Sequence, residues 1–141
     1  MRFFEANECH LQSIKEIESE CLDKKLFQDF KFLIGNPNYR VYVCVDRDVV
    51  TGYIALSISF EQADILQICV KKSYQRKGYA SFLMMQTIKL LKDQGVNQLF
   101  LDVNENNFVA INLYKKFGFD ILYKRANYYG TQTALIMQKN L

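Results

Sequence analysis

The sequence has little of what marks several common classes of protein. It contains one proline and six glycines, so long flexible linkers between domains are not expected. It has no run of about 18 apolar residues, so no membrane-spanning helix is predicted. The first ten residues, MRFFEANECH, include no long apolar segment before their first acids. A secretory signal is therefore not expected either, and a cytoplasmic protein is predicted.

Histidine is nearly absent, and the cysteines lack the spacing of a metal site. His10 is the only histidine, and Cys9, Cys21, Cys44 and Cys69 form no C-x-x-C pair. Structural zinc sites commonly contain such pairs, so no metal site is predicted. In a reducing cytosol the four cysteines are expected to be small buried hydrophobic residues.

The chain does have enough apolar material for one folded domain. Half of its 141 residues are apolar and no internal repeat divides them, so residues 1–141 are predicted to form a single domain. The net charge of +3 is small for a protein that binds nucleic acid over its whole surface, so no nucleic-acid partner is predicted. Without a long apolar run, no membrane partner is predicted.

Hydrophobic periodicity predicts the element order β-α-α-β-β-β-α-β-α-β-β, which is typical of a mixed α/β sheet. Asn7 is a good cap for the first helix, and Gly35 with Asn36-Pro37 ends the second. Gly78 and Gly95 bound a helix of about 15 residues. The predicted strands are residues 2–6, 41–45, 54–60, 63–71, 99–103, 119–124 and 133–139.

Apolar residues recur at helical spacing in all four predicted helices, and in the first they are Leu11, Ile14, Ile17 and Cys21. The helix after strand 99–103 is expected to be capped by Asn106 and to end at Gly118, with Tyr114 at the edge of its stripe. The expected stripes of the other three helices are Leu26, Phe27, Phe30, Leu33 and Ile34; then Ala80, Met84, Ile88 and Leu91; and last Ala110, Leu113 and Phe117.

The stretch SYQRKGYA, residues 73–80, joins a predicted strand to a predicted helix. A helix N-terminus offers unpaired N–H groups and a positive dipole end, which suit a phosphate. Gly78 lets an oxygen approach the backbone, and Arg76 and Lys77 add charge. An ordinary turn or a solvated basic loop explains the same residues. G-x-x-x-x-G-K-[ST] and G-x-G-x-x-G are absent, which argues against a nucleotide triphosphatase and a dinucleotide-binding fold.

Two motifs together resemble those of one family. Q-R-K-G-Y-A, from Gln75 to Ala80, resembles the [RQ]-x-x-G-x-[GA] loop of the GNAT (Gcn5-related) acetyltransferases. N-x-x-A-x-x-L-Y-x-x-x-G-F, from Asn107 to Phe119, resembles a later helix of that family. The resemblance implies an α/β fold with a central mixed, mostly antiparallel sheet, two splayed parallel strands and helices on both faces. It also implies an acetyl-CoA-dependent N-acetyltransferase.

The second half of the chain is similar to one branch of that family. LDVNENNFVAINLYKKFGF and RANYYGTQTALIM resemble the bacterial ribosomal-protein-alanine N-acetyltransferases. Those enzymes acetylate the α-amine of a ribosomal protein's N-terminal alanine. The loop GTQTA is shorter here than is common in that branch and lacks its acidic residues. This departure leaves the peptide specificity open.

The resemblance implies that acetyl-CoA lies between the two splayed strands, here 63–71 and 98–103. The backbone of the first strand pairs with the pantetheine arm, and one of its N–H groups polarises the thioester carbonyl. Asn107 stands where relatives place an asparagine against the cofactor, although a second helix cap beside Asn106 explains it too. The implied cofactor-binding residues are Ile68, Cys69, Val70, Gln75, Arg76, Lys77, Gly78, Tyr79, Ala80, Ser81, Asn107 and Tyr114.

Tyr114 is implied by the resemblance to be the general acid that protonates the leaving thiolate. A phenol with a reference pKa of about 10 can give its proton to the thiolate as it forms. An aromatic residue that packs beside Leu113 and Phe117 is the structural alternative. An acyl-enzyme on Cys69 is not expected, because no histidine lies near it in the sequence and buried strand cysteines are usually inert.

Asp102 is the candidate general base, and its side chain points opposite to Leu101 and Val103 in the strand LFLDV. Relatives that acetylate alanine usually carry glutamate here; the shorter aspartate can act through a water. Asp64 is a rival, because the histone-acetylating branch uses a carboxylate on the strand before the loop. A strand-end cap is the structural alternative for Asp102.

Three functions remain open from the sequence. The first is acetylation of a protein N-terminus, for example that of a ribosomal protein. The second is acetylation of a small amine, such as a polyamine, an amino acid or an antibiotic, and the third is a CoA-binding module without catalysis. Tyr123, Tyr128 and Tyr129 lie where relatives have a substrate groove, although a hairpin-end aromatic patch explains them equally. The chain is expected to be a monomer or a homodimer.

Overall fold

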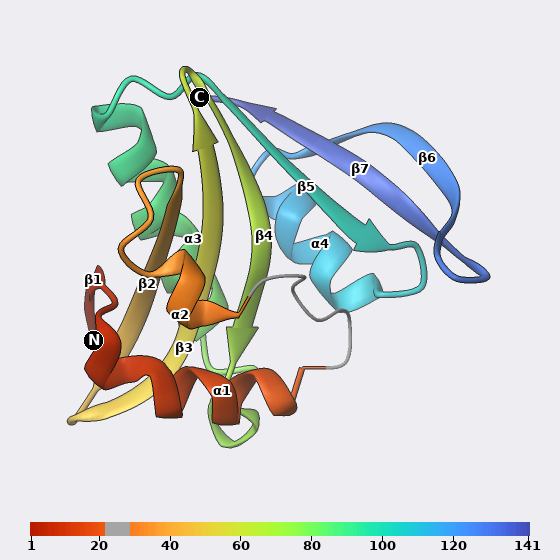
Figure 1. Ribbon diagram of the computed structural model, residues 1–141. Helices are drawn as coiled ribbons and strands as arrows, with labels where there is room; N and C mark the ends of the chain where they lie inside the picture. The colour runs from red at the N-terminus through yellow and green to blue at the C-terminus, as the bar shows by residue number, and fades with distance from the viewer. Residues whose placement is uncertain (22–28) are drawn as a thin grey trace.

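The structure is a computed structural model that describes residues 1–21 and 29–141. Seven strands form one sheet, with helices on both of its faces (Figure 1). The predicted order of strands and helices is confirmed in the part described. The elements are β1 (Arg2–Glu5), η1 (Glu8–His10), α1 (Leu11–Ser19), α2 (Phe30–Leu33), β2 (Tyr39–Asp46), β3 (Val49–Ser59), β4 (Gln62–Val70), η2 (Lys72–Tyr74), α3 (Tyr79–Asp93), β5 (Gln98–Asn104), α4 (Phe108–Lys116), β6 (Asp120–Tyr129) and β7 (Gln132–Asn140).

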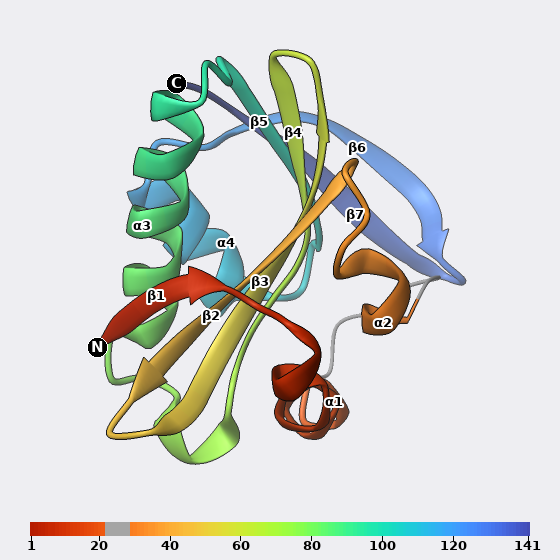
Figure 2. The same cartoon turned by 60° about the vertical axis from the view of Figure 1, so that its left-hand side comes forward.

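The sheet has the strand order β1-β2-β3-β4-β5-β7-β6. Strands β4 and β5 run parallel, and every other neighbouring pair in the described sheet is antiparallel. Helices α1 and α2 cover one face and helices α3 and α4 the other, as the turned view shows (Figure 2). The predicted mixed, mostly antiparallel sheet is therefore confirmed.

The sheet is buried on both faces, so alternate residues of its central strands enter different cores. In β2, Tyr42 and Cys44 pack with helices α3 and α4, whereas Val41, Val43 and Val45 pack with helices α1 and α2. The side chains of a strand alternate between faces, so the continuous apolar run from Val41 to Val45 stabilises both layers. This alternation also decides on which side each candidate site residue lies.

Helix α3 begins and ends at the predicted glycines. Gly78 precedes it with a φ of +89°, and Gly95 follows it with a φ of +84°. Such positive φ values are cheap for glycine and costly for other residues. The predicted stripe is partly right: Met84 and Leu91 are fully buried, and Leu83 joins them. Ala80 and Ile88 are only partly buried at the edge of the stripe.

Helix α4 begins one residue later than predicted, so its buried stripe is rotated. The prediction of Asn106 as the cap is wrong: the Asn107 side chain accepts a hydrogen bond from the Ala110 N–H at 3.2 Å. Asn106 is instead held in the preceding turn, where its N–H donates to Asn104 Oδ1 at 2.9 Å. The residues of α4 that are fully buried are Ile111 and Tyr114, whereas the predicted Ala110, Leu113 and Phe117 are half-buried.

Helix α2 is shorter than the stripe predicted for it. Asp29 caps it by accepting a hydrogen bond from the Phe32 N–H at 3.0 Å. Phe30 and Leu33 are buried as predicted. Leu26 and Phe27, the first residues of the predicted stripe, lie outside the described residues.

The prediction that all four cysteines are small buried hydrophobic residues is wrong for three of them. Cys44 is buried and free, but Cys9 is exposed. Cys21 and Cys69 form a disulfide with their Cα atoms 6.3 Å apart. Helix α1 packs across β4 on the face to which Cys69 points, and this brings Cys21, just beyond the end of α1, to Cys69. The Cys69 sulfur is thereby occupied, which agrees with the prediction that it is not a nucleophile.

Candidate active site

The candidate site is the gap where β4 and β5 separate. The two strands pair from Gln62–Ile65 on β4 to Gln98–Leu101 on β5, and no pairing follows. A bulge marks the point of separation: Ala55 on β3 pairs with Gln67 and Leu56 pairs with Ile65, which leaves Leu66 without an opposite residue. Bulges bend a strand and increase its twist, so β4 turns away from β5 here (Figure 1).

Alternate backbone groups of β4 face this gap. The Lys71 N–H donates to Thr51 O of β3 at 2.7 Å, so Cys69 in the same register also directs its backbone toward β3. Ile68 and Val70 direct theirs to the other edge, into the gap. Of the three residues predicted to pair with the pantetheine arm, these two therefore have the right orientation.

The loop after β4 presents an anion-binding surface at the start of α3. The first turn of α3 closes with a hydrogen bond from the Phe82 N–H to Gly78 O at 3.0 Å. The N–H groups of the residues between them, Tyr79, Ala80 and Ser81, have no acceptor within the helix. A Cβ built on Gly78 would meet nothing within 4 Å, so the backbone is open to a ligand there. These features fit a phosphate group.

Side chains at both ends of the loop fasten it to the sheet. The Gln75 side chain donates to Val70 O at 3.0 Å. The Tyr79 hydroxyl donates to Asp46 Oδ2 at the end of β2, at 2.6 Å. This hydrogen bond, together with desolvation and the charge of Asp46, raises the pKa of Tyr79 to about 12. The predicted cofactor residues Arg76 and Lys77 are exposed, with Lys77 Nζ 3.3 Å from Ser73 O.

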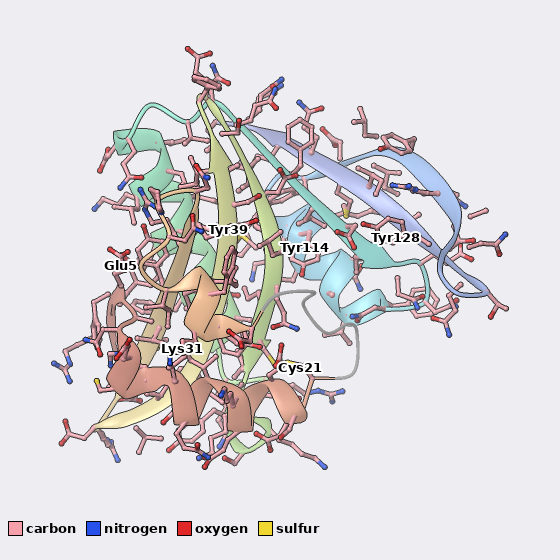
Figure 3. The ribbon with its side chains drawn as sticks, viewed as in Figure 1. Glu5, Cys21, Lys31, Tyr39, Tyr114 and Tyr128 are labelled. Atoms are coloured by element: carbon pink, nitrogen blue, oxygen red, sulfur yellow. A yellow bond between two sulfur atoms is a disulfide. The ribbon has the colours of Figure 1, made fainter. Side chains whose placement is uncertain are left out.

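Tyr114 lies on the buried side of α4, not at the edge of its stripe as predicted. Its side chain is 6% exposed and its ring meets Phe119 edge-on, with the ring centres 5.9 Å apart. It belongs to the core that α3 and α4 form with Leu101 and Val103 of β5. In Figure 3, Tyr114 lies where the ribbons of β4 and β5 have separated.

Asp102 lies on the opposite face of β5 from Tyr114. Its neighbours Leu101 and Val103 enter the core that contains Tyr114, so the Asp102 side chain points to the α1 and α2 face. Asp64 pairs in register with Phe100, which places Asp64 diagonally from Asp102 on the same face. The two candidate bases are thus neighbours, and the candidate acid lies on the opposite face of the sheet from both.

Tyrosines of β6 lie on the same face of the sheet as Asp102. Burial, followed by the negative charge of Asp102, raises the pKa of Tyr128, while Arg125 lowers it. The Arg125 guanidinium lies over the Tyr128 ring, 4.8 Å from its centre. Tyr123 and Tyr128 are 52% and 39% exposed. Figure 3 shows Tyr128 on the ribbon of the last two strands. For Tyr129 the structure gives only the backbone, which pairs with Gln132.

A buried polar pair on the same face was missed from the sequence. The Tyr53 hydroxyl donates to Gln67 Oε1 at 2.5 Å, and both residues are almost fully buried. Gln67 follows the bulge directly, so this pair lies beside the point where β4 leaves β5. The sequence signal was available, because Gln67 is a polar residue inside the apolar run ADILQICV.

A comparison with family models identifies the chain. The acetyltransferase (GNAT) family model matches residues 6–119. The chain belongs to the GNAT acetyltransferase family. The predicted membership of this family is thereby confirmed, and this GNAT chain is an acetyl-CoA-dependent acetyltransferase. In the part of the chain that the structure describes, no helix is long and apolar enough to cross a membrane.

Similar proteins agree with this assignment. A Bacillus subtilis protein, proposed to be a ribosomal protein bS18-alanine N-acetyltransferase, is 30% identical over 90% of this chain and 87% of its own length. The Escherichia coli ribosomal-protein-S18-alanine N-acetyltransferase has a similar fold, with a TM-score of 0.85 at 22% identity over 99% of this chain and 92% of its own. A Bacillus anthracis protein proposed to be a streptothricin acetyltransferase, solved with acetyl coenzyme A, has a TM-score of 0.82 at 19% identity over 99% of this chain and 97% of its own.

Proposed function

We propose that this GNAT enzyme acetylates the α-amine at the N-terminus of a protein, for example a ribosomal protein, by direct attack in a ternary complex. The observation that carries the proposal is the placement of Asp102 and Tyr114 on opposite sides of the gap between β4 and β5. An amine that enters from the face of α1 and α2 meets a carboxylate first. A thiolate that leaves toward the other face meets a buried phenol.

The cofactor side of the proposal rests on backbone geometry. Ile68 and Val70 are proposed to pair with the pantetheine arm, and the N–H groups at the start of α3 to bind the pyrophosphate. An N–H of β4 in the gap is positioned to polarise the thioester carbonyl. Acetyl-CoA supplies the activated acetyl group. The Asn107 side chain caps the first turn of α4. With the helix starting there, Tyr114 lies on its buried side, three positions after Ile111.

The acid and the base divide the proton transfers. Asp102 is proposed to accept the proton of the attacking amine, directly or through a water, and Tyr114 to donate a proton to the leaving sulfur. An α-amine has a reference pKa of about 8 against about 10.4 for lysine, so a larger fraction of it is already neutral near pH 7. An α-amine substrate can therefore be deprotonated by a weaker base, such as an aspartate, than a lysine side chain would need.

Two observations favour a protein N-terminus over a small amine. The Bacillus subtilis relative, which matches 90% of this chain, is named for alanine acetylation of a ribosomal protein. In addition, Tyr123 and Tyr128 beside Asp102 are exposed, as an open peptide-binding groove requires. Their hydroxyls are proposed to hydrogen-bond the backbone of the acceptor.

The proposal includes a cytoplasmic location, where ribosomal proteins are assembled. Disulfides are uncommon in that compartment, because its thiol pool keeps most cysteines reduced. The bond between Cys21 and Cys69 is therefore the one observation that stands against this location.

A comparison of two acceptors tests the proposal. CoA release from acetyl-CoA is measured with a short peptide that begins with a free alanine and, separately, with spermidine. We expect kcat/KM to be at least about 100-fold higher for the peptide, because a site built for a peptide backbone gains binding that spermidine does not supply. The peptide contains no lysine. The control is this peptide with its N-terminus blocked, and it should release no CoA above background. Faster turnover of spermidine would favour the small-amine enzyme instead.

A further inference from the structure

We infer that Asp46 is a positioning residue for acetyl-CoA binding, which acts by holding Tyr79 and, through it, the first turn of α3. Asp46 is the last residue of β2 and Tyr79 is the first of α3, 33 positions later. The Tyr79 hydroxyl donates to Asp46 Oδ2 at 2.6 Å, the length of a strong charge-assisted hydrogen bond. No motif of the loop includes Asp46, and only the folded structure brings it there.

The loop needs such an anchor because its own backbone is irregular. Arg76 has a φ of +60° and Gly78 a φ of +89°, so two of the three residues before α3 are in the left-handed region. At the near end, Gln75 ties the loop to Val70 O at 3.0 Å. At the far end, Tyr79 supplies the tie to β2, and the Tyr74 ring packs edge-on against it at 5.4 Å.

The direction of the N–H groups depends on the far anchor. Phosphate binding needs the first N–H groups of α3 to converge on one point, and Tyr79 carries the first of them. Its ring is fastened through Asp46 to the end of β2, so the first helical turn is set relative to the sheet that flanks the gap. Without the hydrogen bond, the turn must be ordered each time the cofactor binds, which weakens binding.

The charge of Asp46 alone does not explain its presence. A carboxylate beside a phosphate-binding loop opposes anion binding, whereas the hydrogen bond that Asp46 accepts from Tyr79 gives it a positioning role. Asp48, in the same β-turn, offers a matched control. It carries the same charge, its side chain is 99% exposed, and its partner in the structure is Arg2 at 3.8 Å rather than the loop.

The test compares two acetyl donors in the Asp46→Ala, Tyr79→Phe and Asp48→Ala variants. Acetyl-CoA carries the pyrophosphate, and S-acetylpantetheine ends before it. For Asp46→Ala and Tyr79→Phe we expect the KM for acetyl-CoA to rise about tenfold, as for loss of one hydrogen bond to a charged group. For Asp46→Ala, kcat, the acceptor KM and the kcat/KM with S-acetylpantetheine should stay at the wild-type value. Asp48→Ala should match wild type with both donors.

Two further variants separate positioning from a general loss of structure. Asp46→Asn keeps an oxygen that accepts from Tyr79, so it should retain most of the affinity for acetyl-CoA. The double variant Asp46→Ala with Tyr79→Phe should be no worse than either single change, because both remove the same contact. Additive losses, or an equal fall of kcat/KM with both donors, would overturn the inference.

The inference rests on the proposed role of the loop in binding the pyrophosphate, and the experiment keeps the two apart. If the wild-type enzyme uses S-acetylpantetheine as well as acetyl-CoA, the proposed cofactor site is wrong. If wild type prefers acetyl-CoA strongly and the Asp46→Ala variant keeps that preference, the cofactor site stands and the role of Asp46 is wrong.

Discussion

Replacing Tyr114 by phenylalanine is expected to lower kcat about 100-fold, while the KM values for acetyl-CoA and for the acceptor stay within about twofold. The reason is that the substitution removes the hydroxyl proposed to protonate the leaving sulfur and keeps the ring. Tyr114 is 6% exposed and packs on Phe119, so phenylalanine fills the same space. Steady-state CoA release at saturating concentrations of both substrates measures the effect.

The control for this substitution lies in the same aromatic pair. Phe119→Leu disturbs the packing of the Tyr114 ring but keeps the Tyr114 hydroxyl. It should therefore lower the melting temperature and leave kcat close to the wild-type value. A fall of less than about tenfold in kcat for Tyr114→Phe would mean that the residue is part of the core only and that another group protonates the thiolate.

Replacing Asp102 by asparagine is expected to lower kcat/KM about 100-fold. Asparagine keeps the size of the side chain and cannot accept the proton of the amine. Asp64→Asn is the matched variant, and its effect should be below about tenfold. The pairing of β4 and β5 ends at Ile65 and Leu101, so Asp102 borders the gap while Asp64 lies within the paired part.

The two variants are compared with the same acceptor over the same pH range. If Asp64→Asn loses more activity than Asp102→Asn, the base is on β4 and the roles are exchanged. If neither changes kcat/KM, a different group accepts the proton. Either outcome would leave the cofactor side of the site intact, because neither carboxylate is on the edge of β4 that Ile68 and Val70 present.

The sequence predicted the elements that flank the proposed cofactor site well, because local rules govern them. Gly78 and Gly95 bound α3 where glycine is the residue that tolerates a positive φ. The apolar run ADILQICV predicted β4. The resemblance of the loop then located the gap, and the structure agrees because β4 and β5 do separate beyond Ile65.

The register of α4 could not be predicted because three good capping residues lie close together. Asn104, Asn106 and Asn107 are equally suited by type, and the choice depends on which N–H each side chain reaches. In the structure Asn104 binds the Asn106 N–H, and Asn107 caps the helix. That shift by one residue moves Tyr114 from the edge of the stripe into the core, which changes the argument for its role.

Contacts between distant segments could also not be predicted from the sequence. Cys21 and Cys69 are 48 positions apart, and Asp46 and Tyr79 are 33 apart, so no spacing rule connects either pair. The bulge at Leu66 is a further example. It shifts the alternation of β4, so that Ala63 and Ile65 before it and Ile68 and Val70 after it face the same core.

Acetylation of an α-amine is tested most simply with one peptide that carries two different amines. The peptide begins with a free alanine and contains one internal lysine. After incubation with acetyl-CoA and the enzyme, tandem mass spectrometry locates the added acetyl group. We expect the acetyl group on the N-terminal α-amine, with the lysine unmodified. Acetylation of the lysine side chain, or of neither amine by an enzyme that binds acetyl-CoA, would contradict the proposed function.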